Sequence, residues 1–408
     1  MTNKNLISLN NFSLYKFTIF NFIEKFLAYL SPLLVIQLLG DRVLYNEIEL
    51  IYSISLIFNV FFDFGIRGYF TYSLRKIKDK KKYASEILQL FNLLFLLISI
   101  VFLISIISIH NLDNFFNLTI YMLVYFRFAY LFITSFYKVY FRMISNPFFI
   151  FYFTITSNIM ILIVIIYGVL IKDSKIDLIM FFLPIIGFSL LYLLYLFVYI
   201  KIKFNIYKLI KFIINSTKFY WPIILTSTIS LFLGNFIKIF SYYELSSYDM
   251  TKSSFFLRIL MIIQLTHASF ATYYLKKNFL ENIKIIDKKI LFMYLRNMTI
   301  VMVVIFLLTP IYIAHLNLNL ELDIIFIFMS FYVYLWCIGS YLEQFLTKYN
   351  YNIYILKYYS ISVILYVSVL IFINVLNLTT ISFAMFISSL VYLIFILIKL
   401  FKLKILTS

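Results

Sequence analysis

Long apolar stretches recur about every 30 residues along the chain, and short polar segments separate them. A stretch of about 20 mostly apolar residues is long enough for an α-helix to cross the hydrocarbon core of a bilayer. The predicted spanning segments, twelve in all, cover residues 15–40, 45–74, 84–109, 115–137, 148–171, 177–200, 219–243, 250–275, 290–314, 322–346, 353–374 and 379–400. The pattern therefore predicts an all-α integral membrane protein with short connections and no soluble domain.

The twelve segments divide evenly into two halves, which we expect to form six-helix bundles over residues 1–200 and 201–408. Six is an even number, so both halves enter the membrane with the same orientation. Any pseudo-twofold axis between them then runs along the membrane normal. A weak similarity supports the comparison, since Pro32 and Gly40 in the first half have counterparts in Pro222 and Gly234. This layout, with a cleft between two bundles, is typical of transporters.

Composition agrees with this prediction, because 64% of the residues are hydrophobic and only 13% are charged, against about a quarter in soluble domains. The formal net charge is nevertheless +18, with 35 Lys and Arg. Most of these lie in loops on one side of the predicted membrane, and the other side has Arg42, Lys172, Lys175 and Lys252. Because basic short loops stay in the cytoplasm, we expect both termini to be cytoplasmic. The first segment is expected to be retained rather than cleaved, and the excess charge needs no nucleic-acid partner.

Several cations fall inside the predicted helices: Lys25, Arg67, Arg127, Lys238, Arg258 and Arg296. Each would cost about 2.5–3.5 kcal/mol at a lipid-facing helix centre, so most should face protein, water or a ligand. Arg296 lies near a helix end and could extend to the interface. The predicted helices hold fewer acids, namely Glu24, Asp63 and Glu343. The surplus of positive charge favours an anionic substrate, because phosphate oxygens accept charge-assisted hydrogen bonds from Arg and Lys.

Local spacing refines the roles of these residues. Asp63 and Arg67 stand four residues apart on the second segment, which suits either a structural ion pair or a direct role in binding. Glu24 and Lys25 are adjacent, so they point about 100° apart on a helix and cannot pair along one face. Lys238 shares one stripe of its helix with Asn235 and Tyr242. The hypothesis assigns substrate binding in a cationic lumen to Lys25, Arg67, Arg127, Lys238 and Arg258, with Glu24, Asp63, Asn235 and Tyr242 in support.

Motifs for soluble enzyme chemistry are missing from the sequence. There is no glycine-rich ATP-binding loop, no HExxH and no CxxC, and the three histidines are scattered. The single cysteine, Cys337, lies in an apolar stretch and is interpreted as a buried thiol. We therefore predict no catalytic residues, no metal site, no cofactor and no enzymatic activity, and coupling to H⁺ or Na⁺ stays open.

The stretch Leu38-Leu39-Gly40, continuing through Ser53 and Ser55 to Phe62-Asp63-Phe64-Gly65-Ile66, resembles the start of Wzx-type polysaccharide flippases. These belong to the multidrug/oligosaccharidyl-lipid/polysaccharide (MOP) exporter superfamily, in which a basic inner loop follows, here Arg75 to Lys82. The resemblance extends in layout over the whole chain. Many relatives carry an Asp after an Asn in the seventh helix, whereas this chain has Asn235 and Lys238, which puts an ion-coupling role of that helix in doubt.

The resemblance implies a protein of the bacterial inner membrane that acts in O-antigen, lipopolysaccharide or capsule synthesis. It would move an undecaprenyl-diphosphate-linked oligosaccharide to the outer leaflet by alternating access. Its expected partners are this substrate, membrane lipids and polysaccharide polymerase machinery. One alternative is a MATE-like multidrug exporter, although a pocket for organic cations should carry net acid. Another is an O-antigen polymerase or ligase, although the outer loops here are short.

Overall fold

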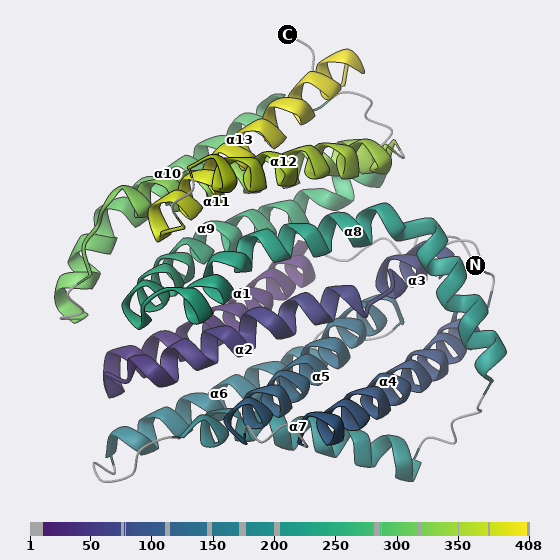
Figure 1. Ribbon diagram of the computed structural model, residues 1–408. Coiled ribbons are helices and arrows are strands. Elements are labelled where there is room, and N and C mark those ends of the chain that lie inside the picture. The colour runs from purple at the N-terminus through teal and green to yellow at the C-terminus, as the bar shows by residue number, and fades with distance from the viewer. Residues whose placement is uncertain are drawn as a thin grey trace. The chain divides into compact units, whose positions relative to one another are not determined.

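The computed structural model describes residues 11–74, 77, 79–110, 115–144, 149–170, 177–199, 205–280, 286, 288–316, 320–349, 351–373 and 376–405. Within these ranges every regular element is a helix (Figure 1). Twelve of the helical stretches found there are long and apolar enough to cross a membrane. The prediction of an all-α membrane protein with twelve spans is confirmed, and the ends of eleven predicted segments agree with the observed spans to within a few residues.

The chain divides into two compact units. One unit is Leu30–Leu231, and the other combines Met1–Tyr29 with Phe232–Ser408. The division falls inside two continuous helices, α1 (Asn11–Leu34) and α8 (Ile206–Glu244). The predicted bundles over 1–200 and 201–408 stay a prediction, as does the side of the membrane on which each loop lies.

The unit Leu30–Leu231 contains the last turn of α1 and the first part of α8. Between them lie the π-helical turn η2 (Val35–Leu39), α2 (Arg42–Phe61), α3 (Ile66–Leu74), α4 (Lys80–His110), α5 (Phe115–Ile144), α6 (Phe149–Leu170) and α7 (Leu178–Tyr199). Helix α5 is at the centre of this unit, because α2, α4, α6 and α7 all pack against it. Side chains on α5 are therefore positioned by several helices at once.

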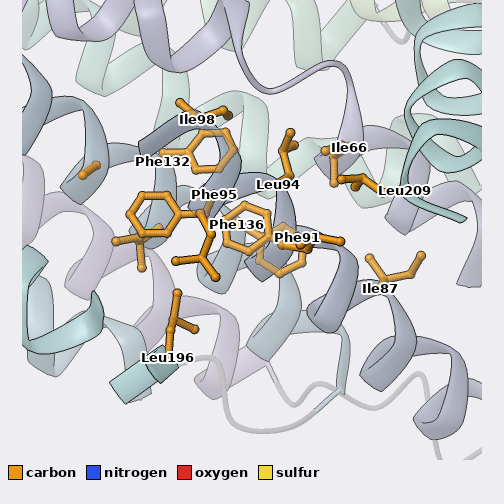
Figure 2. Close-up of a cluster of buried hydrophobic side chains, with 14 of the residues drawn as sticks. Ile66, Ile87, Phe91, Leu94, Phe95, Ile98, Phe132, Phe136, Leu196 and Leu209 are labelled. Carbon is orange, nitrogen blue, oxygen red and sulfur yellow. The ribbon is translucent and has the colours of Figure 1, made fainter. Parts of the chain in front are cut away.

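Aromatic side chains form the core between α4 and α5 (Figure 2). The rings of Phe91 and Phe136 stack with centroids 3.8 Å apart, and Phe91 also stacks on Phe132 at 4.9 Å. Phe95 continues the row along α4, at 6.2 Å from Phe132. Stacked aromatic pairs add about 0.5–1.5 kcal/mol each beyond the area that they bury. Much of the phenylalanine in this chain therefore serves packing rather than ligand binding.

The second predicted segment, 45–74, is not one continuous helix, and this prediction is wrong. Helix α2 ends at Phe61, and α3 begins at Ile66. Between them Phe64 and Gly65 have positive φ angles of 45° and 70°, which lie in the left-handed region and end an α-helix. The apolar pattern continues through the break, so hydrophobicity alone did not reveal it.

Gly65 is required at this break for two reasons. Its φ of 70° strains any residue with a Cβ atom. In addition, a Cβ there would lie 2.7 Å from Cβ of Tyr220 on α8, inside van der Waals contact. The break between α2 and α3 thus allows close packing of α8 within the same unit.

The other unit contains the first part of α1, the end of α8 and five further helices. These are α9 (Ser247–Leu280), α10 (Lys288–Leu316), α11 (Ile324–Lys348), α12 (Asn352–Ile373) and α13 (Leu378–Lys402). Helix α13 packs against α11 and α12, and α9 packs against α10 and α11. Gly339 on α11 allows the close approach of α13, because a Cβ at this position would lie 2.9 Å from the ring of Tyr392.

Candidate functional site

Arg127 lies in an aromatic box inside the unit Leu30–Leu231. It occupies the middle of α5 and is only 7% exposed. Its guanidinium carbon lies 4.1 Å from the ring centroid of Tyr52 on α2 and 5.4 Å from that of Tyr130, one turn further along α5. Both rings also contact α7, since Tyr52 makes an edge contact with Phe182 and Tyr130 makes one with Phe188.

The rings of the box leave hydrogen-bonding groups of Arg127 unsatisfied. Its Nε and Nη1 atoms are buried and have no hydrogen-bond partner within the described part of the chain. A guanidinium has five N–H donors in one plane. Aromatic faces attract its charge but accept none of these hydrogen bonds. Arg127 is therefore a buried cation that retains the capacity to bind an anion.

Two buried acids of α2 were missed by the sequence analysis. Glu47 is 8% exposed and Glu49 is fully buried, and the backbone carbonyl of Glu49 accepts a hydrogen bond from Ser53. Helix α2 begins at Arg42, three residues before the predicted start, so these carboxylates lie well inside it. The surplus of positive charge inside the helices is therefore smaller than the sequence analysis predicted. Both glutamates lie within the first five residues of the predicted segment 45–74. That position in the sequence was enough to identify them as acids inside a predicted helix.

Asp63 and Arg67 form the predicted ion pair, with Nε of Arg67 donating to Oδ1 of Asp63 at 2.8 Å. The pair does not lie along one helix as expected, because Asp63 belongs to the turn and Arg67 to the first turn of α3. Their side chains are 14% and 26% exposed. The salt bridge spans the break between α2 and α3, so its geometry supports the structural interpretation of this pair.

The other predicted cations lie in the second unit. Lys238 on α8 is 2% exposed, and Asn235, one turn earlier, is also buried, whereas Tyr242 is half-buried. A lysine buried to this extent in an apolar helix is a functional candidate by default. The predicted polar stripe of Asn235, Lys238 and Tyr242 on α8 as part of a substrate site stays a prediction.

A contact between α1 and α9 involves another of the predicted cations. Arg258 on α9 is 3% exposed, and its guanidinium carbon lies 5.8 Å from the ring centroid of Tyr29 on α1. Lys25 lies one turn before Tyr29 and is half-buried. Glu24 is buried beside it. Lys25 and Arg258 thus belong to the unit that includes Phe232–Ser408, whereas Arg67 and Arg127 belong to the other unit.

Lys252 has a different role from the one its predicted place in an outer loop suggested. It lies inside α9, is 5% exposed, and its Nζ is 2.7 Å from Oδ2 of Asp323. Asp323 is also the N-cap of α11, where its Oδ1 accepts from the backbone of Ile325. The pair ties α9 to the start of α11. Arg296 is exposed, as expected for a side chain that extends to the interface.

The described residues contain no group of three or more His, Cys, Asp or Glu side chains that could hold a metal ion. Arg75, Lys76 and Lys78 of the predicted basic loop lie outside the described residues. Each unit holds buried cations among its described residues, Arg127 in one and Lys238 and Arg258 in the other, and Arg127 and Arg258 lie beside tyrosine rings.

Comparison with known proteins gives a likeness in structure only. No protein-family model matches the sequence, and no curated protein matches it. Among solved structures, the lipid II flippase MurJ in an inward closed conformation is similar with a TM-score of 0.60 and 17% identity, over 96% of this chain and 88% of that one. A MATE protein in complex with Br-NRF is also similar, with a TM-score of 0.48, 12% identity and 96% coverage of both chains. The chain therefore has a fold like that of MurJ.

Proposed function

We propose that this protein is a flippase for a lipid-linked oligosaccharide. The observation that carries the proposal is the burial of Arg127, Lys238 and Arg258, at 7%, 2% and 3% exposure, in helices otherwise apolar enough to cross a membrane. The fold shared with MurJ, named as a lipid II flippase, supports the same class of activity. The resemblance to Wzx-type flippases supports an undecaprenyl-diphosphate carrier with an O-antigen or capsular repeat unit.

The chemistry of the site favours a diphosphate headgroup. A buried arginine or lysine is stabilised by an anion that accepts several hydrogen bonds, and a diphosphate offers many acceptor oxygens. Arg127 has unsatisfied N–H groups with which to meet it. Glu49 and Glu24 lie buried in the same two units as these cations, so each unit also holds a buried acid. An organic cation would find no comparable advantage here.

In the proposed mechanism the headgroup and sugars travel through the protein while the polyprenyl tail stays in the bilayer. The two units alternate between access from the cytoplasmic leaflet and access from the outer leaflet. The protein would act in the bacterial inner membrane with both termini in the cytoplasm. Polysaccharide polymerase machinery would receive the product.

Reconstitution tests the proposal. Proteoliposomes containing a fluorescent undecaprenyl-diphosphate oligosaccharide report flipping as loss of protection from an impermeant quencher. We expect the triple variant Arg127→Ala, Lys238→Ala, Arg258→Ala to flip at least tenfold more slowly than wild type. Arg296→Ala, which removes an exposed cation, is the matched control and should flip normally. Wild-type flipping by a triple variant that remains folded would overturn the basic-lumen mechanism.

A further inference from the structure

The last turn of α13 carries Lys399 between two tyrosine rings that lie beside the start of α12. Its Nζ is 3.5 Å from the ring centroid of Tyr354 and 5.1 Å from that of Tyr351. Among the described residues, the ammonium forms no ion pair. Tyrosine faces attract a cation but accept none of its hydrogen bonds. Lys399 is therefore a fixed cation that retains the capacity to bind an anion.

The packing of α12 on α13 sets the position of this ammonium (Figure 1). Tyr358 of α12 stacks on Phe395 of α13 with ring centroids 5.4 Å apart, one turn before Lys399. The rings of Tyr354 and Tyr358 are 6.4 Å apart and continue the row toward the start of α12. Lys402 follows Lys399 by three residues and is exposed, so both project from the same side of α13. The interface between the two helices thus ends in two neighbouring cations.

A third cation lies where α13 ends. The backbone N–H of Ile405 donates to the carbonyl of Leu400 at 3.1 Å, which closes the helix in a turn that contains a left-handed residue. Glycine usually takes that position, but here it is Lys404, with a φ of 53°. The Lys404 side chain is exposed, so packing does not account for a strained lysine in this turn. Strain of this kind is retained at functional sites, where the side chain has a role.

The same turn is tied to the start of α10. The backbone N–H of Ile286 donates to the carbonyl of Ile405 at 3.0 Å, and both isoleucine side chains are buried. Lys288 and Lys289, the exposed first residues of α10, follow within three residues of Ile286. Helices α10, α12 and α13 contain no Asp or Glu. The nearest acids before α10 in the sequence lie outside the described residues, namely Glu281 and Asp287. The described residues at this end of the unit are therefore strongly basic.

Exposed apolar side chains lie on the same two helices as these cations. They are Tyr354 on α12, and Ile398 and Phe401 on α13. Both helices are long and apolar enough to cross a membrane, so exposed apolar side chains near their ends meet acyl chains, and lysines there meet headgroups. A ligand that fits this surface must therefore carry both an anionic group and a hydrocarbon chain, which a free phosphate ion does not.

We propose that the adjoining ends of α12 and α13 bind the phosphate headgroup of an anionic phospholipid. Lys399, Lys402 and Lys404 donate charge-assisted hydrogen bonds to the phosphate oxygens, and the acyl chains lie along the exposed apolar side chains. Basic pockets between membrane-spanning helices bind headgroups of this kind. The lipid is a bound component of the bilayer and is not transported, so the inference does not depend on the proposed function.

Native mass spectrometry of the full chain in a neutral detergent tests the site, with phosphatidylglycerol, phosphatidylcholine and inorganic phosphate as the added ligands. We expect phosphatidylglycerol to bind much more tightly than phosphatidylcholine, and inorganic phosphate not to displace it. Each lysine near an anionic headgroup contributes about fivefold in affinity, so the double variant Lys399→Gln, Lys402→Gln should bind phosphatidylglycerol about 25-fold more weakly. The matched control is Lys208→Gln, Lys211→Gln, which removes two exposed lysines with the same spacing from α8 in the other unit and should bind normally.

Lys404→Gly separates binding from folding, because glycine adopts a positive φ without strain. We expect this variant to unfold at the same temperature as wild type or higher, and to bind phosphatidylglycerol about fivefold more weakly. Unchanged binding in Lys404→Gly, or in the folded Lys399→Gln, Lys402→Gln variant, would overturn the inference. An equal loss in the α8 control would also overturn it, because it would show an effect of net charge alone. Displacement of the lipid by inorganic phosphate would show a site for free phosphate instead.

Discussion

Replacing Arg127 by methionine should make the protein more stable and less active. An arginine at the centre of a spanning helix destabilises the protein by about 2.5–3.5 kcal/mol. The cation–π contacts of a desolvated guanidinium stabilise it by about 2 kcal/mol. In this protein the cation–π contacts are those of Arg127 with Tyr52 and Tyr130. The Nε and Nη1 atoms of Arg127 have no hydrogen-bond partner among the described residues, so they add no stabilisation. The balance leaves Arg127 destabilising by about 1 kcal/mol. A methionine keeps the apolar stem and removes the charge.

We therefore expect Arg127→Met to raise the midpoint of thermal unfolding of this 408-residue chain by about 1 °C, measured in detergent by intrinsic fluorescence, and to slow flipping at least tenfold. Arg67→Met is the matched control, because it leaves Asp63 without its 2.8 Å partner and should lower the free energy of unfolding by about 1–3 kcal/mol. The cation–π contacts of Arg127 stabilise the protein by about 2 kcal/mol. If Arg127→Met lowered the free energy of unfolding by this amount or more, Arg127 would be a structural residue. Unchanged flipping would equally refute the reasoning.

Two further predictions concern stability and are checked by the same unfolding measurement. Gly40 and Gly65 share a positive φ, but only Gly65 faces a close neighbour, Tyr220. Gly40→Ala should therefore cost about 1 kcal/mol and Gly65→Ala at least about 2 kcal/mol, and equal losses would contradict the steric argument. Asp323→Ala removes both the N-cap of α11 and the partner of Lys252, so we expect a loss of about 2–4 kcal/mol. Asp323→Asn retains a capping oxygen and should lose less, and an equal loss would show that the cap contributes nothing.

The buried cations of the two units were visible in the sequence, because an arginine or lysine in an apolar stretch stands out against its neighbours. Their partners were not visible. Tyr52 and Arg127 are 75 residues apart (127 − 52), and only the packing of α2 on α5 places the ring over the guanidinium. Likewise, only the packing of α9 against α10 and α11 places the hydroxyl of Tyr294 between His267 and the Cys337 carbonyl.

The sequence by itself determined the twelve spans, because the thickness of the bilayer demands about 20 apolar residues for each, and this demand is local. It also placed Asp63 and Arg67 four residues apart, close enough in the chain to form their ion pair, although the pair crosses a turn and not one helix face. The tertiary structure decided the break at Phe64 and Gly65, since the space left there is filled by α8. It also decided which buried charges are paired, because the acceptors and rings around a charge come from helices that are distant in the chain.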